Sequence, residues 1–145
     1  TVVHSGPDII NHNLETVPRL YPEVRPQADY CRSVHLLRMV KAIDPGKITK
    51  SGLMLGLGEE RQEVLQVMAD LRAVSCDLLT LGQYLQPSGK HHPVVRFIPP
   101  EEFEELRRRG EDLGFRGVFS APLVRSSFHA AEVFTRILSP QGMQR

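Results

Sequence analysis

Hydrophobic residues in this chain alternate between short, largely apolar runs and longer stretches in which they recur every three or four positions. A short apolar run bounded by turn residues is typical of a buried strand. Such runs occupy residues 48–57, 78–85 and 118–123, and a shorter one begins at Ile9 and Ile10. We therefore predict four strands.

Segments with helical spacing separate these runs. They predict helices over residues 28–43, 60–74 and 130–138. A fourth helix begins at the Pro99-Pro100 pair and ends at Gly114, because proline suits the first turn and glycine the end of a helix. Its glutamates precede its arginines, which complements the helix dipole and indicates a solvated face.

This alternation of strands and helices predicts an α/β fold with a parallel sheet and outer helices. In such folds the functional groups collect at the carboxyl ends of the strands. Pro22 and Pro26 predict a loop between the first strand and the first helix. A closed eight-stranded barrel takes roughly 250 residues, so 145 residues can form only part of one.

Composition indicates one globular domain, with 41% hydrophobic and 24% charged residues. The formal net charge of +1 does not indicate a nucleic-acid partner or an anionic membrane, because proteins that bind these usually have a large excess of basic residues. No apolar run approaches the roughly 20 residues that span a bilayer. We therefore expect a soluble chain with neither kind of partner.

The two cysteines predict neither a zinc site nor a disulfide framework, because Cys31 and Cys76 lie far apart without a C-x-x-C neighbour. We expect both to be reduced, buried thiols. The six histidines show no metal-ligand spacing. The first residues contain no charged segment followed by an apolar core, so they predict no signal peptide.

A glycine motif occupies the end of the second predicted strand. Gly52, Met54, Gly56 and Glu59 fit the pattern G-x-φ-x-G-x-x-E, where φ is apolar. Glycines there let the backbone approach a cofactor closely, or they serve only a tight turn from strand to helix. A dinucleotide fingerprint fails because Arg61 stands where its third glycine belongs.

The sequence H-N-L-E-T follows the first predicted strand and contains Asn13 and Glu15. In an extended segment these two side chains point to the same side, as a pair that holds a ribose and an amino-acid head group would. The alternative interpretation is a helix N-cap and a surface carboxylate.

A third motif, R-S-S-F, follows the last predicted strand and contains Arg125, Ser126 and Ser127. A hydrolase nucleophile is disfavoured because no G-x-S-x-G elbow and no placed acid accompany these serines. The plain alternative is that one serine caps the helix that follows. Both roles can coexist, with one serine capping and the other binding a ligand.

Together, and in this order, the three motifs resemble those of lipoyl synthase, a radical S-adenosylmethionine enzyme. The resemblance implies a partial (β/α) barrel of the radical S-adenosylmethionine type. Residues 1–145 would form the C-terminal part of this single domain, ending in R-S-S-F and a C-terminal helix. Family members also carry the cysteine triplets C-x3-C-x2-C and C-x4-C-x5-C toward the N-terminus, and this chain has neither. We expect it to be inactive alone.

By resemblance, Ser127 is an oxygen ligand to one iron of an auxiliary 4Fe-4S cluster, and Arg125 orients the loop or neutralises charge nearby. An oxygen ligand binds iron–sulfur iron less tightly than thiolate, which suits a cluster that gives up sulfide. The resemblance also implies a set of residues that line the cofactor cavity: Asn13, Glu15, Lys50, Ser51, Met54 and Gln83.

The implied activity is a sulfurtransferase reaction, the insertion of sulfur at carbons 6 and 8 of a protein-bound octanoyl-lysine. It uses 5′-deoxyadenosyl radical chemistry, S-adenosylmethionine and two 4Fe-4S clusters, the auxiliary one as sulfur donor. Implied partners are an octanoylated lipoyl carrier domain or H protein and an electron donor such as ferredoxin or flavodoxin. The implied location is the cytoplasm, or a mitochondrion or plastid in a eukaryote.

Two alternatives remain open. One is another radical S-adenosylmethionine sulfur-inserting enzyme, such as one similar to biotin synthase, which would share the glycine motif but has no reason to carry R-S-S-F. The other is a non-catalytic truncated fragment that carries the motifs without the chemistry.

Overall fold

The structure of the chain is a computed structural model that describes residues 9–123. The predicted helix over residues 130–138, together with Arg125 and Ser127, lies outside the described residues. The elements within that part follow one another in this order: β1 (Ile9–Asn11), η2 (Pro18–Leu20), α1 (Tyr21–Val24), α2 (Tyr30–Ile43), β2 (Ile48–Leu55), α3 (Arg61–Ala73), β3 (Leu78–Gln83), α4 (Pro100–Leu113) and β4 (Gly117–Ser120).

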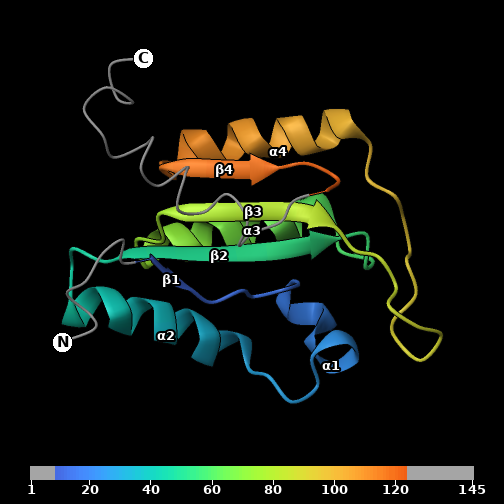
Figure 1. The fold of residues 1–145 in the computed structure, drawn as a ribbon, viewed down its shortest axis with the longest axis horizontal. Coiled ribbons are helices and arrows are strands. Elements are labelled where there is room, and N and C mark those ends of the chain that lie inside the picture. The colour runs from blue at the N-terminus through green and yellow to red at the C-terminus, as the bar shows by residue number, and fades with distance from the viewer. Residues whose placement is uncertain (1–8, 124–145) are drawn as a thin grey trace.

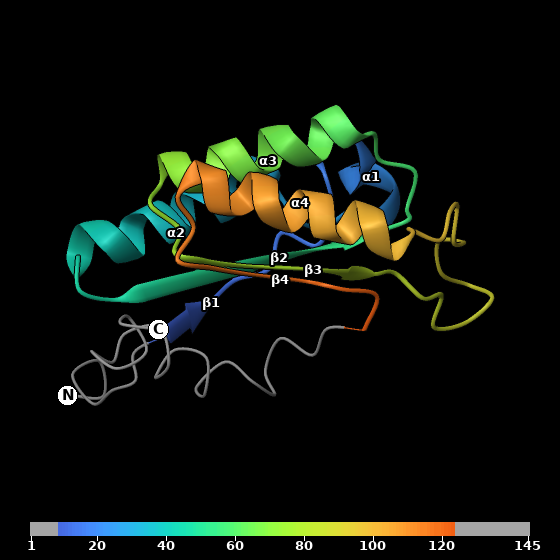
Figure 2. The same cartoon turned by 90° about the horizontal axis from the view of Figure 1, so that it is seen from above.

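The strands form one open, fully parallel sheet in the sequential order β1-β2-β3-β4 (Figure 1). The helices α2, α3 and α4 all lie on the same face of this sheet (Figure 2). The predicted α/β class is therefore confirmed. Sequential order with one-sided helices is the arrangement that a segment of a (β/α) barrel has, and the barrel type itself stays a prediction.

Local sequence explains where the helices begin and end. The carboxylate of Asp29 caps α2 by accepting a hydrogen bond from the Arg32 amide at 3.0 Å. Glu60 and Glu63 form a capping box at the start of α3. Gly114 ends α4 with a φ of 103°, a left-handed conformation that glycine adopts without strain.

Side chains alternate between the two faces of the central strands. Leu53 and Leu55 of β2 pack with Leu79 and Leu81 of β3 in the core beneath the helices. The residues between them face the other side of the sheet. The core also receives Val64, Val67, Met68 and Leu71 from α3.

Several sequence predictions need correction. The loop expected around Pro22 contains the short helix α1, which tolerates this proline in its first turn, where the missing N–H has no helical partner to lose. Strands β2 and β3 each end two residues earlier than expected, and β4 ends three residues earlier. Cys31 is exposed rather than buried. Within residues 9–123, no helix has the length and apolar character needed to cross a membrane.

Candidate functional site

A small hollow opens on the helix-free face of the sheet, toward the carboxyl ends of β2 and β3. It is lined by residues of the H-N-L-E-T segment, the glycine motif and β3, namely Asn13, Glu15, Gly52, Leu53, Met54, Thr80 and Gly82. Two of the three sequence motifs thus meet in space. Of the six residues expected to contact a cofactor, Asn13, Glu15 and Met54 line this hollow.

Main-chain hydrogen bonds hold the H-N-L-E-T segment along β2. The Glu15 amide donates to the Gly52 carbonyl at 3.0 Å, and the Glu15 carbonyl accepts from the Met54 amide at 2.8 Å. The expected extended conformation is wrong at Glu15, whose φ of 72° is left-handed. Asn13 and Glu15 nevertheless line the same hollow.

Asn13 brings an unsatisfied acceptor to the hollow. Its Oδ1 atom is buried and has no hydrogen-bond partner among the residues that the structure describes. A buried acceptor left in this state costs about 1–3 kcal/mol. A ligand that donates a hydrogen bond to this oxygen from a hydroxyl or ammonium group would remove this energetic penalty.

Gly52 leaves the floor of the hollow open. A Cβ atom at this position would lie 2.3 Å from Thr80 Oγ1 and 3.1 Å from Asn13 Oδ1. A side chain here would therefore fill the space between Asn13 and Thr80. Lys50 shares this face of β2 two residues earlier and is buried, and this burial lowers the pKa of its ammonium group.

Ser51 and Gln83 do not belong to the hollow. Ser51 Oγ accepts a hydrogen bond from the Leu14 amide at 3.2 Å. The Gln83 amide donates to the carbonyls of Tyr84 and Arg96 at 2.9 and 3.1 Å, and its oxygen accepts from the Ile98 amide at 2.8 Å. Both side chains thus hold neighbouring backbone in place.

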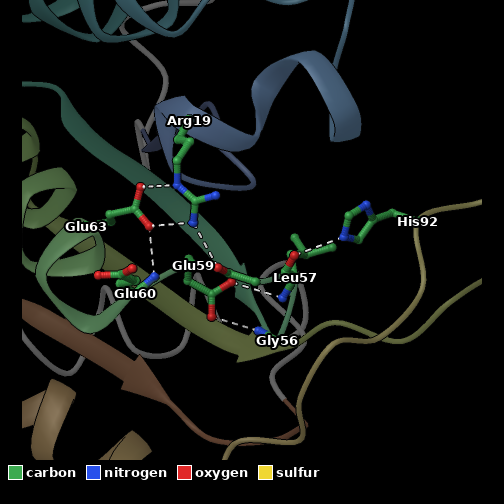
Figure 3. A network of polar contacts seen from close by, with 8 residues as sticks. Arg19, Gly56, Leu57, Glu59, Glu60, Glu63 and His92 are labelled. Atoms are coloured by element: carbon green, nitrogen blue, oxygen red, sulfur yellow. Dashed lines mark hydrogen bonds and ion pairs between the residues drawn. The ribbon is translucent and has the colours of Figure 1, made fainter.

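The loop after β2 is a tight turn as well as a site of close backbone approach. Gly56 has a φ of 100°, and a Cβ there would lie 2.3 Å from the Arg96 carbonyl oxygen. The Glu59 carboxylate accepts hydrogen bonds from the amides of Gly56 and Leu57 at 2.9 and 3.0 Å (Figure 3). The turn interpretation of the glycine motif therefore holds at Gly56 and Glu59.

Sequence reasoning missed two side chains that organise this loop. Arg19 donates from Nε and Nη2 to the Glu63 carboxylate at 2.9 Å and from Nη2 to the Gly58 carbonyl at 2.9 Å. His92 Nε2 lies 2.9 Å from the Leu57 carbonyl oxygen. Neither side chain has a characteristic sequence signal, because both act across long separations in the chain.

The cysteines do not form a metal site in the described part of the chain. No group of three or more histidine, cysteine, aspartate or glutamate residues is placed there to hold a metal ion. Cys31 is exposed on α2, whereas Cys76 is fully buried, and burial raises the pKa of its thiol to about 11. Arg125 and Ser127 lie outside the described residues, so their predicted roles rest on the sequence.

No family model matches the chain. A lipoyl synthase of Caldanaerobacter subterraneus is 58% identical over 130 residues, which are 90% of this chain and 46% of that protein. A lipoyl synthase of Alkaliphilus metalliredigens is 55% identical over 135 residues, 93% of this chain and 47% of that protein. A lipoyl synthase of Acidithiobacillus ferrooxidans is 61% identical over 131 residues, 90% of this chain and 41% of that protein.

The chain thus spans a little under half the length of the curated relatives that it matches. The matched part is the C-terminal one. The motifs quoted above and the identity of 55–61% over about 90% of the chain agree on one family. By sequence, about 90% of the chain is similar to the C-terminal part of proteins named lipoyl synthase, at 55–61% identity.

Proposed function

We propose that this chain supplies the S-adenosylmethionine-binding part of a lipoyl synthase. The complete activity would insert sulfur at carbons 6 and 8 of a protein-bound octanoyl-lysine. The observation that carries the proposal is the hollow in which Asn13 Oδ1 lies buried without a partner among the described residues. The identity to proteins named lipoyl synthase supports the same assignment.

The groups around the hollow fit the chemistry of S-adenosylmethionine. Asn13 Oδ1 would accept a hydrogen bond from a ribose hydroxyl or from the amino group of the ligand. The Glu15 carboxylate would attract the positive charge of the ligand, and the apolar side chain of Met54 would pack on its adenine. Gly52 and Gly82 place only backbone at the surface of the hollow, which allows close approach.

When bound, S-adenosylmethionine and a reduced 4Fe-4S cluster supply the abstraction of hydrogen from an unactivated carbon. The contribution of this chain is to hold the ligand in one orientation and to keep water out of the hollow. Lys50, buried on the same face of β2, would place its amine near this space, and burial lowers the pKa of that amine.

The described residues do not fit a 4Fe-4S cluster, since Cys31 and Cys76 occupy separate places and no ligand group surrounds either. Ser127 remains our proposed oxygen ligand to an auxiliary cluster, with Arg125 as its support, by resemblance. The thiolates of both clusters would then come from residues that are not in this sequence. The carrier-bound octanoyl substrate and an electron donor such as ferredoxin or flavodoxin are the proposed partners.

The presence of only two cysteines, neither in a triplet, favours a second candidate, a non-catalytic fragment. One experiment separates the two. A hybrid joins the part of the Caldanaerobacter relative that precedes the matched region to this chain, and its clusters are reconstituted without oxygen. We expect the hybrid to convert an octanoyl-lysine peptide into the lipoyl product, which mass spectrometry detects.

Variants of the hybrid connect the activity to the hollow. Asn13→Ala should lower the product yield, because it removes the acceptor. Gln62→Ala, which shortens an exposed amide side chain on α3, is the matched control and should leave the yield unchanged. A hybrid that carries both clusters and forms no lipoyl product would favour the non-catalytic candidate.

A further inference from the structure

Arg19 bonds to the loop that follows β2, the strand that contributes Gly52, Leu53 and Met54 to the hollow. It belongs to η2, which directly follows the segment with Asn13 and Glu15. Its guanidinium group reaches across to Glu63 in the first turn of α3 and to the Gly58 carbonyl in the loop after β2 (Figure 3). Arg19 therefore connects η2, which comes after the segment with Asn13 and Glu15, to the loop that follows β2.

Most of the polar backbone groups in the loop over residues 56–60 form hydrogen bonds. The Gly56 carbonyl accepts from the amides of Val95 and Arg96, at 2.8 and 3.3 Å. Further bonds at this loop come from Glu59, Glu63, His92 and Arg19, as Figure 3 shows. Among these side chains, Arg19 is the one that belongs to η2, the helical turn shortly after Asn13 and Glu15.

The planar fork of arginine suits this position. Nε and Nη2 each donate to one oxygen of Glu63, and Nη2 also donates to the Gly58 carbonyl. A lysine at this position has a single nitrogen and cannot reproduce the bidentate contact together with the carbonyl bond. Glu63 is fixed in turn because it accepts a hydrogen bond from the Glu60 amide at 2.8 Å.

We propose that Arg19 is a positioning residue, which fixes the loop over residues 56–60 against the segment with Asn13 and Glu15 and thereby sets the affinity for S-adenosylmethionine without touching it. This inference rests on the proposed function of the hollow. A preorganised site binds more tightly because less ordering accompanies binding. The Arg19 side chain is 54% exposed, so we expect its main effect to be on the loop rather than on global stability.

Arg19→Lys in the 145-residue chain tests the inference. Amide hydrogen exchange should become faster in residues 56–60, and the Kd for S-adenosylmethionine, measured by calorimetry, should rise about five- to ten-fold, the scale of a typical coupling between sites. The melting temperature should stay close to that of the unaltered chain. The matched control is Arg61→Lys, since Arg61 pairs with Glu105 at similar exposure and away from the hollow.

Chemical rescue distinguishes positioning from a general structural role. In Arg19→Ala, added methylguanidinium should restore tight binding, whereas methylammonium should not, because only the former has a planar fork. Unchanged loop exchange or unchanged affinity in Arg19→Lys would overturn the inference. If the unaltered chain does not bind S-adenosylmethionine, both the proposed function of the hollow and the role of Arg19 are contradicted. If the unaltered chain binds it and the Arg19 substitutions do not change the affinity, only the role of Arg19 is contradicted.

Discussion

The two cysteines have opposite environments, and their reactivity should differ accordingly. Cys31 is exposed on α2, whereas Cys76 is fully buried. The pKa of about 11 leaves about one Cys76 thiol in a thousand ionised at pH 8, and thiolate is the reactive form. We predict that iodoacetamide modifies Cys31 in the folded chain and Cys76 only after unfolding, as peptide mass spectrometry would show. Rapid labelling of Cys76 in the native chain would contradict this burial.

Ser127 has two possible roles that a single substitution separates. If its oxygen is the auxiliary-cluster ligand, Ser127→Ala in the hybrid should largely spare cleavage of S-adenosylmethionine and severely reduce sulfur insertion. If it only caps a helix, the substitution should cost about 1 kcal/mol of stability and leave the chemistry nearly intact.

Measurement of 5′-deoxyadenosine and lipoyl product in one assay distinguishes these roles of Ser127. Ser127→Cys is the informative companion variant, because its tighter thiolate should still permit a cluster but slow turnover. A lipoyl yield near that of the unaltered hybrid from Ser127→Ala would remove the ligand assignment.

At the level of single residues, the motifs identified residues that lie close together, although the conformation expected at Glu15 was wrong. Asn13, Glu15 and Met54, which the motifs single out, line one hollow, and their contact with a cofactor stays a prediction. The motifs could not place Ser51 and Gln83, because the face that each side chain occupies depends on the pairing register and on backbone partners far away in the chain. Whether these residues contact a cofactor stays a prediction.

The loop after β2 should be the element most sensitive to a small change. Gly56→Ala would put a methyl group 2.3 Å from the Arg96 carbonyl oxygen at a φ of 100°. We expect a loss of about 2–4 kcal/mol in the free energy of unfolding, measured by urea denaturation. Gly89→Ala is the control, since its added Cβ would have no heavy atom within 4 Å apart from those of its own residue and its two chain neighbours. Equal effects of the two substitutions would show that the close approach at Gly56 is not present.

Long elements were more predictable than short ones. Apolar spacing and capping residues identified α2, α3 and α4 to within two residues at each end. Helix α1 was missed because its four residues contain too little periodicity and include Pro22. Its place is determined by tertiary contacts, among them the bond of 2.5 Å from the Tyr21 hydroxyl to the Leu14 carbonyl.

At the scale of the whole chain, the alternation of strands and helices predicted a parallel sheet, which the structure confirms, but it did not determine whether the sheet closes. The described sheet is open, and strand count and edge pairing depend on residues beyond any local pattern. The outer edge of β1 pairs with no other strand within residues 9–123. The barrel interpretation therefore rests on strand order, one-sided helices and family resemblance.

The composition of the chain predicts its behaviour toward iron. With two cysteines placed apart, the isolated chain should not assemble a 4Fe-4S cluster, because Ser127 alone cannot replace the thiolates that hold one. Anaerobic reconstitution followed by iron and sulfide analysis checks this, with the hybrid as the positive control. Stoichiometric iron and sulfide with cluster absorbance in the isolated chain would contradict the prediction.

The central claim is that the hollow at Asn13, Glu15 and Met54 holds S-adenosylmethionine. The most direct test is the hydrogen-exchange footprint of this ligand on the reconstituted hybrid. Within this chain, we predict protection confined to peptides that cover residues 12–15, 51–58 and 80–82, and no change in the outer surface of α2. Protection elsewhere, with exchange at residues 12–15, 51–58 and 80–82 unchanged at saturating ligand, would contradict the claim.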